Sequence, residues 1–460
     1  MKKIAYLIVT CMLVFVSCKE QTKEITQEKK EIAQYTIEQF MDNESAGANG
    51  FSADKSKVLI TSNRSGINNM YSTPVKGGEL TPITQSDSSS IYGISYFPKD
   101  DRILFRMDGN GDEIFKIFVK DENGIKALTP LEGVRTSFRG WAKDGKSFFY
   151  GSNERDPQFL DHYEMNIDGY TSKLIYKVES ARDFNAMSDD GKYITLSEAI
   201  NTNDSDLYIV NTETKEQKKI NTTQSGNGHL DFSPDGKTLY FSTDAGAENS
   251  YVSSYDIATG TIERVTNNEW PVFSYYFTHN GTYTVFFTND DAKTVMNVTD
   301  VATGKAINFP EIDGQSVSSA SFSRDETMAL VRVGNSAKPT NMYSYDMNTK
   351  KYYQLTDVLN KAINADDLVE GKVVRFNSFD GVEVPAIYYQ PKQANANNKV
   401  PAIVMVHGGP GGQSRLNFSS RTQYLVNHGY AILAVNNRGS SGYGKTCYQM
   451  DNQNHGDKDL

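Results

Sequence analysis

Leu230-Asp-Phe-Ser-Pro-Asp-Gly-Lys-Thr-Leu-Tyr-Phe241 carries the clearest structural signal in the chain. Two β-favouring runs flank Asp235-Gly236. Asp-Gly between such runs is a strong hairpin signal, because a type I′ turn needs positive φ at both central residues. A third run from Tyr251 to Ile257 and a short fourth run from Glu263 to Thr266 follow. The stretch therefore predicts a small antiparallel sheet of four strands.

This pattern recurs along the chain. The turn residues are Asp54, Asp100, Asp144, Asp190, Asp235, Asn280 and Asp325. They are separated by 46, 44, 46, 45, 45 and 45 residues. A period of about 45 residues with four strands per repeat is typical of β-propeller blades, which must stack because one blade cannot bury both of its faces alone. We therefore expect an all-β, seven-bladed β-propeller over residues 44–360.

The pattern changes after residue 360. A hairpin with its turn at Asp380-Gly381 precedes the apolar run Pro401 to Val406. A helical stretch from Thr422 to Asn427 and a second apolar run from Tyr430 to Val435 follow. Short continuous apolar runs are typical of strands that are buried on both faces of a parallel sheet. The order hairpin, strand, helix, strand predicts an α/β domain.

Two functional interpretations compete for this region. His407-Gly408-Gly409-Pro410 follows the first apolar run, and glycines there let backbone N–H groups approach a substrate carbonyl, as in the oxyanion hole of α/β-hydrolases. Gly439 to Thr446 matches the phosphate-binding pattern G-x4-G-K-[ST]. A phosphate site also needs a helix whose N-terminus faces the phosphates, and Cys447 to Gly456 has little helical amphipathicity. A P-loop NTPase is therefore a minor alternative.

The propeller, the stretch HGGPGGQ (407–413) and the stretch NNRGSSGYGKT (436–446) together resemble the prolyl oligopeptidase (S9) family of serine peptidases. The acylaminoacyl-peptidase and dipeptidyl-peptidase-like branches are the most similar. The resemblance implies that residues 361–460 are the first part of an α/β-hydrolase domain. It also implies hydrolysis of short peptides by Ser-His-Asp acyl transfer, with the propeller gating access and without a cofactor or metal. Gly409 would contribute to the oxyanion hole, with His407 and Gly408 shaping the loop, while Arg438 and Tyr443 would pack near the site.

The nucleophile motif of that family, G-x-S-x-G, does not occur in these 460 residues. Neither Ser440 nor Ser441 has glycine at both flanking positions, and His407 precedes the place where the family carries its nucleophile. We therefore expect no catalytic residue in this chain, with Ser, Asp and His lying beyond Leu460. The chain would be a C-terminally truncated peptidase that is inactive as given. The alternative is a non-catalytic, lipid-anchored propeller that binds a ligand.

The first residues have the pattern of an export signal. Lys2 and Lys3 precede the apolar run Ile4 to Val16, which is shorter than the ~20 residues that a membrane-spanning helix needs. The run ends before Cys18 in a sequence that resembles a bacterial lipobox. We therefore expect a lipoprotein signal peptide over residues 1–17 and lipidation of Cys18. The protein would be an exported bacterial lipoprotein of the cell envelope, membrane-anchored and facing the periplasm or the surface.

Residues 18–43 are charged and poor in apolar side chains, which predicts a tether. The segment from Thr36 to Met41 is a candidate for a short docking helix. The net charge of −10, without a basic stripe, argues against nucleic acid as a partner. The expected partners are peptides and, through the lipid, the membrane. Acids such as Glu113 or Glu154 are candidates for recognising the charged end of a peptide.

Overall fold

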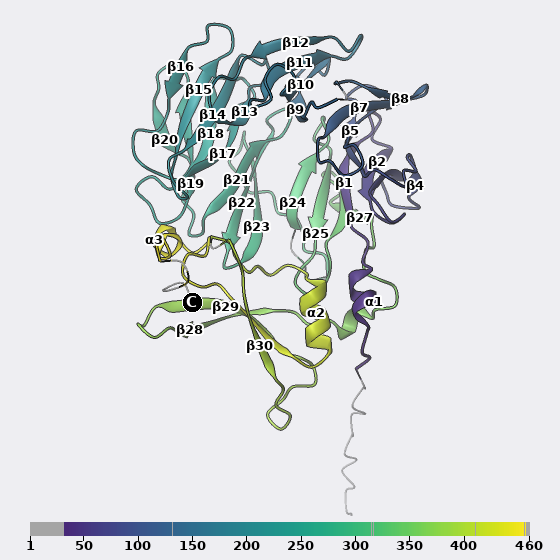
Figure 1. Cartoon of the computed structure of the whole chain (residues 1–460), viewed down its shortest axis with the longest axis vertical. Helices are drawn as coiled ribbons and strands as arrows, with labels where there is room; N and C mark the ends of the chain where they lie inside the picture. Colours follow the sequence, from purple (N-terminus) through teal and green to yellow (C-terminus); the bar gives the residue numbers. More distant parts are fainter. Residues whose placement is uncertain are drawn as a thin grey trace, which may run out of the picture.

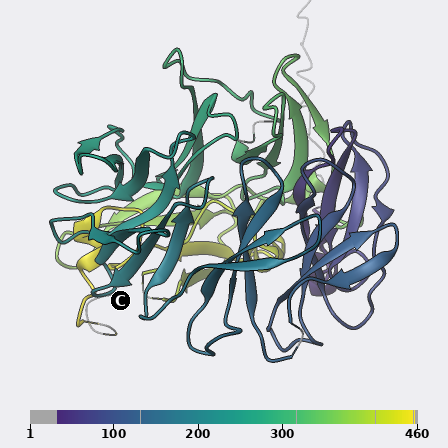
Figure 2. The ribbon, with the colours of Figure 1, turned by 90° about the horizontal axis from the view of Figure 1, so that it is seen from above.

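The structure, a computed structural model, describes residues 32–454 and 456, except residues 131, 314, 316 and 410. The predicted signal peptide and Cys18 lie outside the described residues. Seven small antiparallel sheets follow one another around a ring, as Figure 2 shows from above. A further mixed sheet lies below the ring in Figure 1 and belongs to the C-terminal part, residues 361–456. The predicted seven-bladed propeller is confirmed.

Each blade consists of strands that are consecutive in the sequence. Blade 1 holds β1 (Ala46–Phe51), β2 (Lys57–Ser62), β3 (Asn69–Pro74) and β4 (Thr81–Pro82); blade 2 holds β5 (Ile91–Tyr96), β6 (Ile103–Met107), β7 (Lys116–Asp121) and β8 (Gly124–Ala127); blade 3 holds β9 (Thr136–Trp141), β10 (Ser147–Ser152), β11 (Asp161–Asn166) and β12 (Ser172–Tyr176); blade 4 holds β13 (Asp183–Met187), β14 (Tyr193–Ala199), β15 (Ser205–Asn211) and β16 (Gln217–Lys219). Blade 5 holds β17 (Asn227–Phe232), β18 (Thr238–Thr243), β19 (Tyr251–Asp256) and β20 (Ile262–Arg264); blade 6 holds β21 (Val272–Phe277), β22 (Tyr283–Asp290) and β23 (Lys293–Asp300); blade 7 holds β24 (Val317–Phe322), β25 (Met328–Val333), β26 (Asn341–Asp346) and β27 (Lys351–Gln354).

The hairpin turns between the first two strands of each blade differ in type from the prediction. In blade 5 the Gly236 N–H donates to the Ser233 carbonyl over 2.8 Å, and Gly236 has φ +68° while Asp235 is not among the positive-φ residues. The Asp235 carboxylate instead accepts the Ser233 hydroxyl (2.6 Å) and the Lys237 N–H (3.1 Å). The turn therefore needs positive φ only at the glycine, as in a type I turn followed by a left-handed residue. The hairpins are confirmed, but type I′ geometry is wrong.

The ring closes by side-chain packing between its first and last blades. Val58 and Ile60 of blade 1 pack with Leu330 and Met342 of blade 7 in one buried cluster. An ion pair between Lys55 and Asp325 joins the adjacent turns. All four strands of each of these blades are contiguous in sequence, so the closure rests on packing rather than on a strand shared between the blades.

The C-terminal part contains a four-stranded sheet in the order β28-β29-β31-β30. Its elements are η1 (Ala365–Asp367), β28 (Lys372–Asn377), β29 (Glu383–Tyr389), β30 (Ala402–Val406), α2 (Ser420–Asn427), β31 (Ala431–Val435) and α3 (Lys445–Gln449). Strand β31 pairs antiparallel with β29 and parallel with β30. The parallel pair joined through α2 is the α/β unit that the sequence predicts.

The prediction that both apolar runs are buried on both faces is wrong for the first of them. Strand β31 lies inside the sheet, whereas β30 forms its edge among the described residues. Val404 is 63% exposed and Val406 is 49% exposed. An apolar run indicates that a strand can be buried. Whether the strand is buried depends on which elements lie beside it, and the order of strands in the sheet decides that.

The N-terminal segment packs against the C-terminal part rather than against the propeller alone. Helix α1 (Ile37–Met41) begins with a capping box between Thr36 and Gln39, and Figure 1 shows it beside α2. The Tyr35 N–H donates to the Asn427 side chain over 3.0 Å. Phe40 is fully buried and contacts Tyr424 edge to face at 6.0 Å. From Tyr35 onward the chain therefore runs from a contact with the C-terminal part through the propeller and back to the C-terminal part.

Within the described range, each helix is too short or too polar to cross a bilayer.

Candidate functional site

The predicted oxyanion loop follows β30 directly. Gly408 and Gly409 are exposed, and Gly409 has φ +116°, a conformation that side-chain-bearing residues rarely adopt. A Cβ at Gly409 would lie 3.2 Å from the backbone nitrogen of Gly412, so the chain passes closely over itself here. The glycines thus give a tight loop whose backbone is open to solvent at the carboxyl end of a sheet strand.

His407 links this loop to the segment after β31. Its Nε2 lies 2.8 Å from the Ser440 hydroxyl, which in turn lies 2.6 Å from the Asn437 carbonyl. Because the carbonyl accepts the only hydroxyl proton, the imidazole is the donor to Ser440. A Ser nucleophile needs the opposite direction of proton transfer, and Ser440 is fully buried. The pair is a clamp between two loops rather than a catalytic dyad.

The segment after β31 is held by polar contacts and by an ion pair. Asn436 accepts the Ser414 N–H over 2.6 Å and donates to the Tyr443 hydroxyl over 3.0 Å. Arg438 is buried beneath the hairpin turn of β28 and β29, where it pairs with Asp380. Burial raises the pKa of Tyr443, so its hydroxyl stays protonated. These contacts explain why a loop of this composition adopts one conformation.

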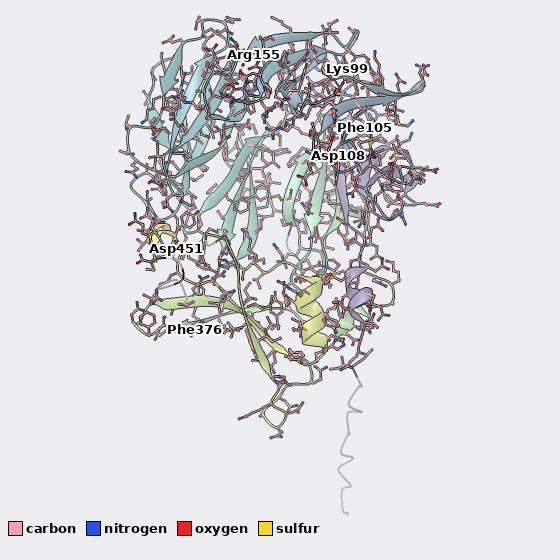
Figure 3. The ribbon with its side chains drawn as sticks, viewed as in Figure 1. Lys99, Phe105, Asp108, Arg155, Phe376 and Asp451 are labelled. Atoms are coloured by element: carbon pink, nitrogen blue, oxygen red, sulfur yellow. The ribbon has the colours of Figure 1, made fainter. Side chains whose placement is uncertain are left out.

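In the segment after β31, Gly439 lies very close to the carboxylate of Asp451. A Cβ at Gly439 would collide with the Asp451 carboxylate, which lies beside α3 in Figure 3. Asp451 is 3% exposed. The glycine at position 439 is therefore explained by its close contact with Asp451. A bound phosphate is not needed to explain it.

The residues of the P-loop pattern contact the propeller. The Glu248 carboxylate accepts the Thr446 N–H (2.9 Å) and the Thr446 hydroxyl (2.7 Å). These bonds hold the pKa of Glu248 below its usual value. Lys445 pairs with Asp244 over 3.1 Å and with Asp204 over 3.7 Å. Carboxylates of blades 4 and 5 thus surround the groups that would hold a phosphate.

A second contact between the two parts comes from blade 6. The tip between β22 and β23 places Ala292 (1% exposed) in a cluster with Ile387, Tyr389 and Ile432 of the C-terminal part. The Leu416 N–H donates to the Ala292 carbonyl over 3.1 Å. Strands β22 and β23 have eight residues each, the longest of the propeller. Sequence reasoning missed this contact, although the length of this hairpin was a signal for it.

The remaining sequence candidates are placed as follows. The side chains of Glu113 and Glu154 are exposed on the loops after β6 and β10. Among the described residues, there is no group of three or more His, Cys, Asp and Glu side chains arranged to hold a metal ion.

Comparison with known protein families gives one match in the propeller and one in the C-terminal part. Residues 83–358 match the family model of the prolyl oligopeptidase N-terminal β-propeller domain, and residues 416–460 match that of the prolyl oligopeptidase family. Dipeptidyl aminopeptidase BIII of Pseudoxanthomonas mexicana is 25% identical over 413 residues, which are 83% of this chain and 57% of that protein. The prolyl endopeptidase of Elizabethkingia meningoseptica is 22% identical, over 84% of this chain and 56% of that protein.

Solved structures share the fold. A puromycin hydrolase superimposes with a TM-score of 0.72 at 16% identity, covering 93% of this chain and 72% of the other. The chain spans somewhat more than half the length of the curated relatives named above. The propeller match covers more than half of the chain, and the second match, over residues 416–460, begins within the C-terminal part. The chain therefore belongs to the prolyl oligopeptidase family.

Proposed function

We propose that this chain supplies the propeller and the oxyanion loop of a serine peptidase that hydrolyses short peptides by Ser-His-Asp acyl transfer. The observation that carries the proposal is the exposed Gly408-Gly409 backbone at the carboxyl end of β30, next to the propeller. In α/β-hydrolases this loop donates an N–H to the tetrahedral intermediate, and one such donor contributes about 3–4 kcal/mol. The peptidase relatives and the family match support the same reaction.

The propeller would gate access to this site. Contacts from several blades join it to the C-terminal part, among them the acids around Lys445, the blade 6 tip at Ala292 and Ser336 of blade 7. A ring fixed over the site at several points would exclude folded proteins and admit short peptides.

Residues 1–460 expressed alone are expected to lack peptidase activity, because the family's nucleophile motif does not occur in them. A fluorophosphonate probe, which labels activated serines, should leave this polypeptide unlabelled. Labelling that disappears in Ser440→Ala would contradict the proposal and assign the nucleophile to Ser440. The coding sequence downstream of Leu460 gives the complementary test, since an open frame that contains G-x-S-x-G supports the peptidase.

In a protein that carries this downstream region, Gly409→Ala tests the oxyanion loop. Alanine is unfavourable at φ +116°, so the loop should shift and kcat should fall about 100- to 1000-fold with little change in KM. Gly381→Ala is the matched control, because that glycine also has positive φ (+87°) but lies in the hairpin turn of β28 and β29. An unchanged kcat in Gly409→Ala would refute the role of this loop.

We further propose that the protein is an exported lipoprotein anchored through Cys18. The support is the basic, apolar and Cys18-terminated pattern of the first residues. Metabolic labelling with palmitate should mark the wild type and not Cys18→Ser. Equal labelling of both, or secretion of the wild type into the soluble fraction, would favour an ordinary signal peptide.

The non-catalytic alternative is a propeller that binds a ligand without turnover, and a stop codon directly after Leu460 would favour it. Nucleotide binding at Gly439–Thr446 is the weaker alternative, because Glu248 and Asp244 place negative charge where phosphates would lie. Measurable ATP binding that Lys445→Met abolishes would revive it.

A further inference from the structure

An arginine in the wall of the propeller forms no ion pair with any acid in the described part of the chain. Arg139 lies on β9, the innermost strand of blade 3. Its Nε is buried and has no hydrogen-bond partner among the described residues. The charged neighbour that acts on it is Arg135, which has the same sign, and burial together with this repulsion lowers the pKa of Arg139. Arg139 as a residue is half-buried, and a cation in such a place is stabilised by a neighbouring anion.

A histidine without partners lies on the same side of the blade. His162 is 1% exposed, and neither of its ring nitrogens has a partner among the described residues. Its ring lies 4.6 Å from the ring of Phe184, and the Arg139 guanidinium lies 4.4 Å from the same ring. Burial and the Arg139 charge lower the pKa of His162 to about 3, so the imidazole is neutral and keeps one N–H donor.

The backbone beside Arg139 leaves room for the guanidinium. A Cβ at Gly151 would lie 3.1 Å from an Arg139 nitrogen, so the guanidinium occupies space that a larger side chain at position 151 would approach closely. Asp161 is adjacent to His162 in sequence, but its carboxylate is bound to Arg155 and to the Val178 N–H. The acid beside His162 in the sequence is thus committed to Arg155.

These residues lie at the contact between blades 3 and 4, which we call the blade 3–4 seam. The fully buried hydrophobic residues of this seam, Ile194, Leu196 and Val210, all come from blade 4. Blade 3 adds the half-buried Tyr176 to that cluster and presents Arg139 and His162 beside it. By contrast, blades 2 and 3 share a cluster with fully buried aromatic residues from both sides. The blade 3–4 seam is therefore more polar than the contact between blades 2 and 3, and its blade 3 side carries positive charge.

We propose that the blade 3–4 seam is a carboxylate-binding site for a peptide ligand, with Arg139 as the primary contact. The planar guanidinium fork matches a carboxylate, and charge-assisted pairs of this kind are among the strongest hydrogen bonds in proteins. The carboxylate comes either from the C-terminal end of the peptide or from an acidic side chain. The choice of a peptide rests on the proposed function, whereas the site itself needs no nucleophile.

Binding to residues 1–460 tests the site directly. The probes are Ala-Ala-Ala with a free carboxylate, its C-terminal amide, and Ala-Ala-Glu amide, titrated by calorimetry. The free acid should bind about 10- to 100-fold more tightly than the amide, the range for charge-assisted hydrogen bonds. If Ala-Ala-Glu amide binds as tightly as the free acid, the site recognises acidic side chains. If it binds as weakly as Ala-Ala-Ala amide, the site recognises the C-terminal carboxylate.

Arg139→Gln should abolish the difference between acid and amide. The matched control is Arg106→Gln on blade 2, where the arginine also lies over aromatic rings, at 4.7 Å from that of Phe115. Arg106→Gln should keep the full difference. Equal affinity of acid and amide for the wild type, or an unchanged difference in Arg139→Gln, would overturn the inference.

Stability separates a binding role from a structural one. Because Arg139 has no acidic partner, Arg139→Met should unfold at the same temperature as the wild type or a higher one. A markedly lower unfolding temperature would show that Arg139 supports the fold and would count against the site. Failure of the peptidase proposal would appear as missing turnover in the longer protein, which leaves this binding test unaffected.

Discussion

Ser440 and His407 show that a residue pair can have the composition of a catalytic dyad and another role. The Ser440 hydroxyl joins the Asn437 carbonyl to the His407 imidazole inside the protein. Ser440→Ala leaves both partners without their bond, so the free energy of unfolding should fall by about 1–3 kcal/mol. Urea unfolding measures this loss. Ser441→Ala is the control: its hydroxyl makes one longer bond, 3.3 Å to Gly412, and a loss as large as that in Ser440→Ala would contradict the assignment.

Asp231 predicts a pH dependence of stability. Burial raises its pKa to about 7, although the Phe232 and Phe277 N–H groups donate to its carboxylate. Below about pH 4 the group is protonated in both the folded and the unfolded states. Between pH 4 and 7 the unfolded state loses the proton first, so the contribution of Asp231 to stability falls as pH rises, by on the order of 3–4 kcal/mol.

The measurement is the difference in unfolding free energy between the wild type and Asp231→Asn across this range. The difference should shrink toward pH 7, and a constant difference would contradict the assignment. Asp235→Asn provides the opposite sign, because the Ser233 hydroxyl and the Lys237 N–H lower the pKa of Asp235. Its contribution is present above about pH 4 and is lost as the pH falls.

Individual residues were predictable where their role is local. The tight loop at Gly408 and Gly409 was predictable because a glycine pair after an apolar strand is a local signal, while its role in an oxyanion hole stays a prediction. The contact of Glu248 with Thr446 of α3 and the setting of Arg139 at the blade 3–4 seam were not predictable, since they are made by residues far away in sequence. A sequence pattern indicates the conformation that its own segment favours. The role of a residue also depends on the residues that contact it from distant parts of the chain.

At the scale of elements, the blade 6 tip offers the sharpest test of how the two parts are joined. Ala292 is buried among residues of the C-terminal part, so Ala292→Glu would bury a charge without a partner. Its unfolding free energy should fall by about 3 kcal/mol or more, and limited proteolysis should separate the two parts. Ala302→Glu is the control in the exposed turn that follows β23. Equal resistance of both variants to proteolysis would contradict the proposed contact.

Strands and hairpins were predictable as elements, whereas their surroundings were not. Asp235-Gly236 placed a turn correctly but did not fix its type, because Ser233 captures the Asp235 side chain and shifts the positive φ to glycine alone. The run that became β30 was suited to burial, yet sheet order placed it at an edge. The local side chains determine whether a segment forms a strand or a turn. The order in which strands pair determines which other elements cover that segment.

For the whole molecule, the ring was predictable because each blade repeats the same local pattern, and identical units stack in one way. The attachment of the C-terminal part was not, because it depends on single contacts from different blades, such as Lys445 with Asp244 and Ala292 with Ile387. Periodicity therefore predicted the architecture of the propeller and gave no information about the side on which the second part docks.

Residues 1–460 should self-associate through β30. Val404 and Val406 project from an edge strand, and exposed apolar edges template pairing with another chain. Val404→Lys should shift the sedimentation profile toward the monomer. Val301→Lys changes a similarly exposed valine (48%) in a turn of blade 6 and should leave the profile unchanged. A wild type that is already monomeric at high concentration would refute the expectation.

The docking of α1 on α2 determines when, during synthesis of the chain, α1 can fold. The Tyr35 N–H and its partner Asn427 are separated by 392 residues. A ribosome that adds ~5–20 residues per second needs roughly 20–80 s to cover that distance. A helix of five residues is not stable in water by itself, so this segment stays unfolded during the wait. All seven blades can form before α1 finds its place, and α1 therefore attaches to the C-terminal part late although it is made early.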